Sequence, residues 1–291
     1  MRLPVVFYVG TCLACASAAA LGQAGQGATG VPTATRWTLD AAGPSQGSTI
    51  RSVYLLVCPA ADKEGTAFLL KDGTMVTDEH VVAGCTKEQL YARSAYGREV
   101  RFSKVVTDRD RDLALLVPSE KLLGGLDLGP DTGPAVGTRV STWGFPLTYS
   151  GPAPLLSVGY VAGYAARTVG GRTVKHVVVN GAFNPGNSGG PVLKFGDDKV
   201  IGIVVWKMVV LPGWVEQAIG RFMHPFTKVS GNFGRRLPDG TIKPISDQEM
   251  TGLILDQFYK TVQVVIGEAT AASELRDFIK SHQTELTEPP R

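Results

Sequence analysis

A glycine-rich turn around Ser188 constrains this chain more than any other stretch. The serine lies in the run AFNPGNSGGPVL, residues 182–193, between two apolar segments. A serine hydroxyl is a weak nucleophile until a general base takes its proton and donors stabilise the oxyanion that its attack creates. Glycine and serine are also common in ordinary turns, so the motif is informative only if a suitable histidine and acid occur elsewhere.

The chain supplies both companions upstream of the serine. His80 lies in the run VTDEHVV, and Asp112 directly precedes the apolar strand LALL, residues 113–116. The order His, Asp, Ser is the order of the triad in chymotrypsin-type barrels. Asp108 and Asp110 share the charged run with Asp112, but only Asp112 adjoins the strand. We therefore expect Asp112 to orient the histidine and the other two to be surface charges.

Over roughly residues 48–230 the chain resembles the chymotrypsin-like serine proteases, and its motifs are most similar to the bacterial HtrA/Deg branch. The resemblance rests on the three motifs and on residues 140–146 and 157–161, which are similar to second-barrel segments of that branch. It implies an all-β fold of two six-stranded antiparallel β-barrels with the active site between them, plus C-terminal helices.

The same resemblance assigns roles to individual residues. Ser188 would attack a peptide carbonyl, His80 would take and return the proton, and Asp112 would orient His80. The backbone N–H groups of Gly186 and Ser188 would form the oxyanion hole. Neither a cofactor nor a metal is implied.

The pattern of short strands separated by turns also predicts an all-β barrel protein. A Gly-, Pro- and Asp-rich stretch, residues 122–137, is the candidate connection between barrels. The protease domain is then predicted over 48–235, with barrels at about 48–125 and 136–235. The strands are expected at 53–57, 66–70, 74–77, 101–106, 113–117, 140–146, 157–161, 173–179, 190–194, 200–206 and 222–229.

The N-terminal residues differ in composition and apolar pattern from the centre of the chain. Residues 1–24 combine a positive start, an apolar run and small residues, which predicts a cleaved signal peptide and an exported, periplasmic or secreted protein without stable membrane insertion. An uncleaved anchor is the alternative. Residues 25–47 lack apolar periodicity and are expected to be a flexible leader.

A helical extension is predicted over 244–284. Ser246 and Glu249 form a capping box before apolar residues at helical spacing up to Gly267, and a second helix is expected over 271–282. We expect these helices to pack on the second barrel, as a C-terminal helix does in the resembled family. The extension is too short for the PDZ domain that HtrA proteins usually append.

Removal of the signal leaves two cysteines, Cys58 and Cys85. In an exported chain such a pair favours a disulfide, which here would fix the loop carrying His80. Two buried, reduced thiols are the alternative.

Composition and motif order limit the other functions. A formal net charge of +3 with interspersed signs does not suggest a nucleic-acid partner. An α/β-hydrolase would need the order Ser, acid, His, whereas here His80 and Asp112 both precede Ser188. His176, His224 and His282 show no metal-ligand spacing. The interpretation is a serine endopeptidase acting on polypeptides; the alternative is a catalytically silent binding protein with the protease fold.

The resemblance also suggests a specificity pocket. The family builds it from the residues six and five before the serine and from two nearby strands, for which residues 202–207 and 226–229 are candidates. Without an acidic residue in the pocket, cleavage after Lys or Arg is disfavoured. We expect small or medium aliphatic residues before the cut bond, or acidic residues if the basic side chains point inward. The predicted pocket residues are Ala182, Phe183, Lys207 and His224.

Overall fold

The computed structural model describes residues 30–147, 149–205, 234–236, 242–244, 251–253, 255 and 266–287. The described residues from Pro32 onward belong to one unit. The predicted signal peptide, residues 1–24, lies outside the described residues. Within the described ranges no helix has the length and apolar character needed to cross a lipid bilayer.

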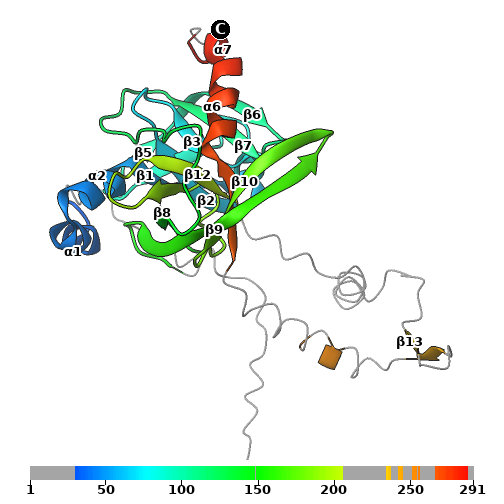
Figure 1. Ribbon diagram of the computed structural model, residues 1–291. Coiled ribbons are helices and arrows are strands. Elements are labelled where there is room, and N and C mark those ends of the chain that lie inside the picture. Colours follow the sequence, from blue (N-terminus) through cyan, green and yellow to red (C-terminus); the bar gives the residue numbers. More distant parts are fainter. Residues whose placement is uncertain are drawn as a thin grey trace, which may run out of the picture. The chain divides into compact units, whose positions relative to one another are not determined.

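Two helices precede the first barrel, where a flexible leader was expected. They are α1, Thr33–Ala41, and α2, Pro44–Ser52 (Figure 1). Proline suits the first position of α2 because its missing N–H would have no helical partner there. Thr35 donates a hydrogen bond to the carbonyl of Ala95 at 2.6 Å, and Ile50 is fully buried. The prediction was wrong for residues 33–47 because these tertiary contacts leave no apolar periodicity in the sequence.

The first barrel is an antiparallel sheet in the order β5-β4-β1-β2-β3-β7-β6. Its two edge strands, β5 and β6, are separated in the chain only by Arg101. The seven strands therefore correspond to six with one bent strand, whose halves pair with β4 and β7 and bring the sheet edges together. The strands are β1 Val53–Cys58, β2 Lys63–Leu69, β3 Met75–Thr77, β4 Tyr91–Ser94, β5 Glu99–Val100, β6 Phe102–Asp108 and β7 Leu113–Pro118.

Short elements connect these strands where the site will form. A 3₁₀ turn, Pro59–Ala61, joins β1 to β2, and the four-residue helix α3, Glu79–Val82, follows β3. The interior of the barrel is apolar, with Leu56, Leu69 and Leu116 fully buried. This core holds the loop after β3 and the loop before β7 at fixed positions.

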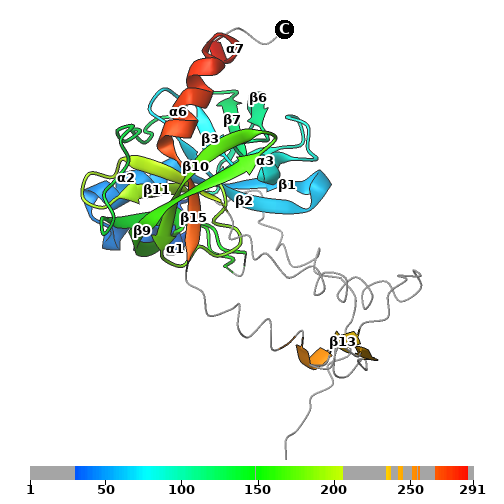
Figure 2. The ribbon, with the colours of Figure 1, turned by 45° about the vertical axis from the view of Figure 1, so that its right-hand side comes forward.

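The second barrel is closed, in the order β10-β15-β12-β11-β8-β9. The prediction of an all-β fold with two barrels is thus confirmed. The long hairpin of β9 and β10 projects from this barrel (Figures 1 and 2). The strands are β8 Arg139–Gly144, β9 Leu155–Val169, β10 Arg172–Asn180, β11 Pro191–Lys194, β12 Val200–Val205 and β15 Gly267–Ala271.

The sixth strand of this barrel comes from an unexpected part of the sequence. β15 lies between β10 and β12, with Val177 opposite Ala269 and Ile203 opposite Thr270. The predicted barrel boundary at 235 therefore leaves out one strand, and Gly267 begins a strand rather than ending a helix. The sequence GEATA was missed because glycine, alanine and threonine carry little apolar alternation. The strand expected over 222–229 lies outside the described residues.

Helix α6, Ala272–Ser281, follows β15 directly, and α7, Gln283–Thr287, follows α6. The second predicted helix is thus confirmed. Leu275 and Phe278 of α6 are fully buried, and the helix contacts β12 and β15 (Figure 2). Of the first predicted helix, only 251–253 and 255 are described, and they are helical. A two-stranded sheet, β13 Gly234–Arg236 with β14 Ile242–Pro244, completes the described elements.

Candidate active site

The serine loop between β10 and β11 is fastened to the first barrel by one threonine of β2. The Thr66 hydroxyl donates to the carbonyl of Gly186 at 2.7 Å, and the Thr66 amide donates to the carbonyl of Ser188 at 2.8 Å. These two bonds fix the backbone on both sides of residue 187. Ser188 is 4% exposed, so its side chain lies just below the protein surface.

Gly186 occupies a position that requires glycine. Its φ is +95°, and a Cβ atom there would lie 2.2 Å from the carbonyl oxygen of Phe145. Any other side chain would combine left-handed strain with a backbone clash. The turn therefore depends on Gly186 for its shape, as expected for a turn that must aim backbone amides.

The amide groups of this turn fall into two sets. The N–H groups of Asn187, Gly189 and Gly190 donate to backbone carbonyls within 3.0 Å. Among the described residues, those of Gly186 and Ser188 donate to no backbone carbonyl. Unused amides beside a serine are the donors that an oxyanion requires.

His80 and Asp112 are joined by two hydrogen bonds. The imidazole Nδ1 lies 2.8 Å from Oδ2 of Asp112, and the His80 backbone N–H donates to Oδ1 at 2.9 Å. The second bond caps the N-terminus of α3, so one carboxylate fixes both the ring and the main chain. Asp112 has a φ of +52°, a conformation that aspartate tolerates better than most residues.

The loop that carries Asp112 is anchored by residues of β15 and α6. Arg111 is 5% exposed and forms ion pairs with Asp108 and, at 3.2 Å, with Glu274 of α6. The carbonyl of Arg111 accepts a hydrogen bond from Thr270 of β15. Asp108, expected to be a surface charge, is instead part of this buried network. Burial raises the pKa of Asp108, but the hydrogen bonds and charge of Arg111 outweigh that effect and leave it below its usual value.

The serine loop and helix α3, which carries His80, approach each other closely at two glycines, Gly65 and Gly189. A Cβ on Gly65 would touch both the Val81 side chain, at 2.8 Å, and the carbonyl oxygen of Ser188, at 3.2 Å. A Cβ on Gly189 would lie 3.0 Å from the amide nitrogen of Asp78. The residues flanking His80 and those flanking Ser188 are thus in contact. The structure pairs His80 with Asp112 and places the backbone beside His80 against the backbone beside Ser188.

A fourth ionisable residue, Asp78, was not singled out by the sequence analysis. It precedes α3 at the N-cap position, and one of its carboxylate oxygens lies 3.9 Å from Nδ1 of His80. Burial raises its pKa well above the usual range, and the charge of Asp112 raises it further. The only sequence signal is its position two residues before His80.

Asp78, His80 and Asp112 also have the ligand types of a divalent-cation site. Each offers one ligand atom, and these atoms lie within 4.8 Å of one another. However, Nδ1 of His80 is already hydrogen-bonded to Asp112, and a fully buried carboxyl is costly to ionise. The arrangement fits an acid–base pair better than a metal centre.

The predicted disulfide is present in the structure. Cys58 and Cys85 are joined by an S–S bond of 2.02 Å with a Cα–Cα distance of 5.8 Å. It links the end of β1 to the loop after α3. Lys63 donates to the carbonyls of His80 and Ala83, which fastens the same helix from β2.

The structure alters the view of the specificity pocket. Ala182 is exposed, whereas Phe183 is 9% exposed and packs in the core of the second barrel. Its ring occupies the space over Gly267, where a Cβ atom would lie 2.2 Å away. Lys207 and His224 lie outside the described residues. β15 pairs with β12 over Gly202–Val205, whereas residues 226–229, on which the argument for His224 depends, also lie outside the described residues, so the role of His224 stays a prediction.

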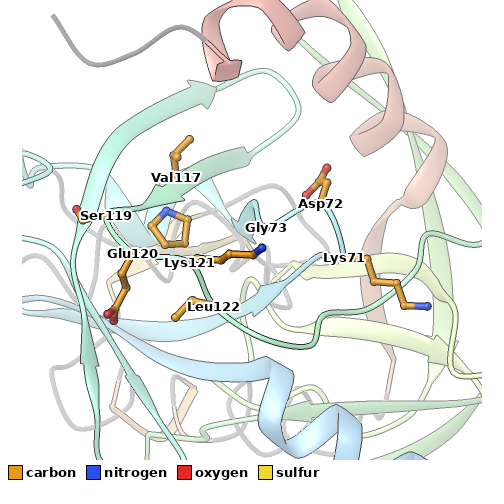
Figure 3. Close-up of a pocket in the computed structure, with 9 residues that line it drawn as sticks. Lys71, Asp72, Gly73, Val117, Ser119, Glu120, Lys121 and Leu122 are labelled. Atoms are coloured by element: carbon orange, nitrogen blue, oxygen red, sulfur yellow. The ribbon is translucent and has the colours of Figure 1, made fainter.

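A separate pocket lies on the first barrel, away from these residues (Figure 3). It is bordered by the β2–β3 turn and by the segment after β7, and its lining includes Lys71, Asp72, Glu120 and Lys121. None of the proposed catalytic residues lines it.

Comparison with known proteins agrees with this geometry. Residues 65–203 match the trypsin-like peptidase domain. A protein of Hahella chejuensis named "Probable periplasmic serine endoprotease DegP-like" is 31% identical over 144 residues, which cover 49% of this chain and 29% of that protein. The corresponding protein of Halomonas elongata is 31% identical over 140 residues, or 48% of this chain and 28% of its own length.

A solved structure shows the same fold. The active form of the Rv3671c protease from M. tuberculosis superposes with a TM-score of 0.54 at 16% identity, covering 81% of this chain and 83% of that one. The fold is therefore chymotrypsin-like, and residues 65–203 are similar to a trypsin-like peptidase domain. The resemblance to these proteases is confirmed, although the chain spans less than a third of the length of the curated relatives named above.

Proposed function

We propose that this chain is a serine endopeptidase that cuts polypeptides through an acyl-enzyme intermediate. The observation that carries the proposal is the doubly bonded His80–Asp112 pair beside the serine loop, in which the amides of Gly186 and Ser188 have no backbone partner among the described residues. The match to a trypsin-like peptidase domain supports the same reaction.

In the first half-reaction, Oγ of Ser188 attacks the carbonyl carbon of the scissile bond. Nδ1 of His80 is bonded to Asp112, which leaves Nε2 to take the hydroxyl proton. The amides of Gly186 and Ser188 donate to the oxyanion of the tetrahedral intermediate. Nε2 then protonates the leaving amine as the C–N bond breaks.

In the second half-reaction, water replaces the amine. His80 takes a proton from the water as its oxygen attacks the acyl carbon, and returns it to Ser188 Oγ as the ester bond breaks. The Asp112 carboxylate stabilises the imidazolium in both halves. Every proton that leaves a nucleophile thus returns to a leaving group.

Export of the protein is part of the proposal. It is supported by the signal-like sequence of residues 1–24 and by the Cys58–Cys85 bond, since such bonds persist mainly in oxidising compartments. The curated relatives carry periplasmic names.

The experiment is active-site labelling combined with turnover of a peptide library. We expect a fluorophosphonate probe to label the wild-type chain and Ser119→Ala, which changes an exposed serine outside the site, but not Ser188→Ala. Library cleavage should follow the same order, with a loss of about 10⁴-fold or more in Ser188→Ala. A wild-type protein that neither labels nor cleaves would reject the proposal and favour a binding role.

A further inference from the structure

Asp78 is a buried carboxyl without a visible partner. It is 0% exposed, and within the part of the chain that the structure describes neither carboxyl oxygen has a hydrogen-bond partner. Aspartate at an N-cap usually accepts from the second or third helical amide, yet Asp78 makes no such bond. Asp112 accepts from that amide, the N–H of His80, instead. Asp78 therefore does not cap the helix, although it is at the N-cap position.

The surroundings of Asp78 show what its carboxyl faces. His80 on α3 lies 3.9 Å away, and ligand atoms of Asp78 and Asp112 lie within 4.8 Å of each other. From the serine loop, Gly189 packs against the Asp78 backbone. On β2, the ammonium group of Lys63 donates hydrogen bonds to the carbonyls of His80 and Ala83. Among the described residues, no lysine or arginine forms an ion pair with Asp78.

Two ionised carboxylates this close, with a single imidazole beside them, would repel each other. Asp112 already has the hydrogen bonds that favour its ionised form. Asp78 has none and is excluded from water, so the proton belongs on Asp78. Burial and the charge of Asp112 both raise the pKa of Asp78, in agreement with this assignment.

We propose that Asp78 is a positioning residue that is protonated in the working enzyme. Its carboxyl O–H donates a hydrogen bond to the Asp112 carboxylate and so holds that carboxylate against His80. The proposal rests on the proposed function, because it concerns the acid–base pair of the same site. The bond forms when the Asp78 side chain turns toward Asp112, and both Asp78 oxygens are free to make it.

This arrangement has a clear chemical effect. With Asp78 neutral, one negative charge rather than two lies beside His80. The proton on Asp78 satisfies a lone pair of Asp112 that the two His80 bonds leave unused. Asp112 is then held from two sides, by His80 and by Asp78.

The first test reads the proton directly and does not depend on activity. Infrared spectra of the full chain in the Ser188→Ala background, which prevents self-cleavage, are compared with and without Asp78→Asn. We expect a carbonyl stretch of a neutral carboxylic acid at pH 7 that Asp78→Asn removes and that the same change at exposed Asp40 leaves in place. A spectrum at pH 7 without such a band would overturn the proposal.

The second test uses two substitutions in the active chain. Asp78→Ala removes the donor and is expected to lower kcat by about tenfold with little change in KM. Asp78→Asn keeps an N–H donor and cannot ionise, so it should recover most of that loss. Equal defects in the two variants, or a change in KM and thermal stability without a change in kcat, would contradict a positioning role.

The two proposals fail in different ways. If the wild-type chain proves inactive, the proposed function fails, and the infrared band still decides the protonation of Asp78. If the wild type is active but Asp78→Asn is no better than Asp78→Ala, only the Asp78 proposal fails. Activity that a chelator abolishes and Zn²⁺ restores would also overturn it, because a metal ligand must be ionised.

Discussion

Asp112 binds His80 at two points, the ring nitrogen and the backbone amide, so a single carboxylate sets both the orientation of the imidazole and the start of its helix. A side chain with this double role should be sensitive to small changes. Replacing it alters the hydrogen-bonding state of the imidazole as well as its position.

We therefore expect Asp112→Asn to reduce kcat by about 10³- to 10⁴-fold, because an amide N–H opposite Nδ1 favours the wrong imidazole tautomer. The measurement is kcat and KM on a peptide found by library digestion, with circular dichroism to confirm folding. Asp110→Asn, the same change two residues away and outside the pair, serves as the control. Comparable losses in both variants would argue against a specific role for Asp112.

Gly186 and Gly73 provide a matched pair for testing the turn. Both have positive φ, +95° and +91°, but a Cβ meets the Phe145 carbonyl at the first and open space at the second. Gly73→Ala should cost about 1 kcal/mol of unfolding free energy and leave turnover near wild type. Gly186→Ala should also lose about 10²-fold or more in kcat, because the clash displaces an oxyanion donor. Chemical denaturation and turnover of both variants check this, and a Gly186→Ala enzyme as active as Gly73→Ala would refute it.

The Cys58–Cys85 bond should stabilise the folded chain by about 3 kcal/mol, since it closes a loop with a sequence separation of 27 residues. The double variant Cys58→Ala/Cys85→Ala should lower the denaturation midpoint accordingly. Wild-type protein unfolded with and without reductant gives the same comparison without a substitution. If the midpoint is insensitive to reductant, the bond does not form in solution.

His176 predicts how stability depends on pH. It is 8% exposed on β10, and burial lowers its pKa, although Glu268, 3.8 Å away, opposes the shift. A lowered folded-state pKa means that the unfolded chain binds the proton more readily. The contribution of His176 is therefore complete above about pH 6.5 and is lost as the pH falls toward its folded-state pKa.

The variant His176→Gln should lose less stability than the wild type between pH 7.5 and pH 5.5, measured as the urea midpoint. His282→Gln, at a half-buried position on the C-terminal side of α6, is the control. An identical pH dependence in His176→Gln and the wild type would exclude His176 as a cause of acid destabilisation.

The order His80, Asp112, Ser188 and the lone cysteine pair could be predicted because each is a local pattern with a chemical requirement. β15 could not, since a strand of Gly, Glu, Ala and Thr is recognisable only by the neighbours that it joins. Asp78 was overlooked because aspartate before a helix is an ordinary cap, and only the tertiary structure shows that Asp112 has taken that role. Asp108 was misjudged for a similar reason, because its partner Arg111 is fixed from Glu274, far along the chain.

The late position of β15 and α6 in the chain makes the order of synthesis relevant to the site. Thr270 and Glu274, which fasten Arg111 beside Asp112, leave a ribosome or an export channel after the histidine and the serine. Until they arrive, β10 and β12 have unpaired edges and the Asp112 loop lacks its anchor. An emerging chain therefore carries its serine and histidine well before it can hold its acid in place, and the acid–base pair can be anchored only after β15 and α6 have followed.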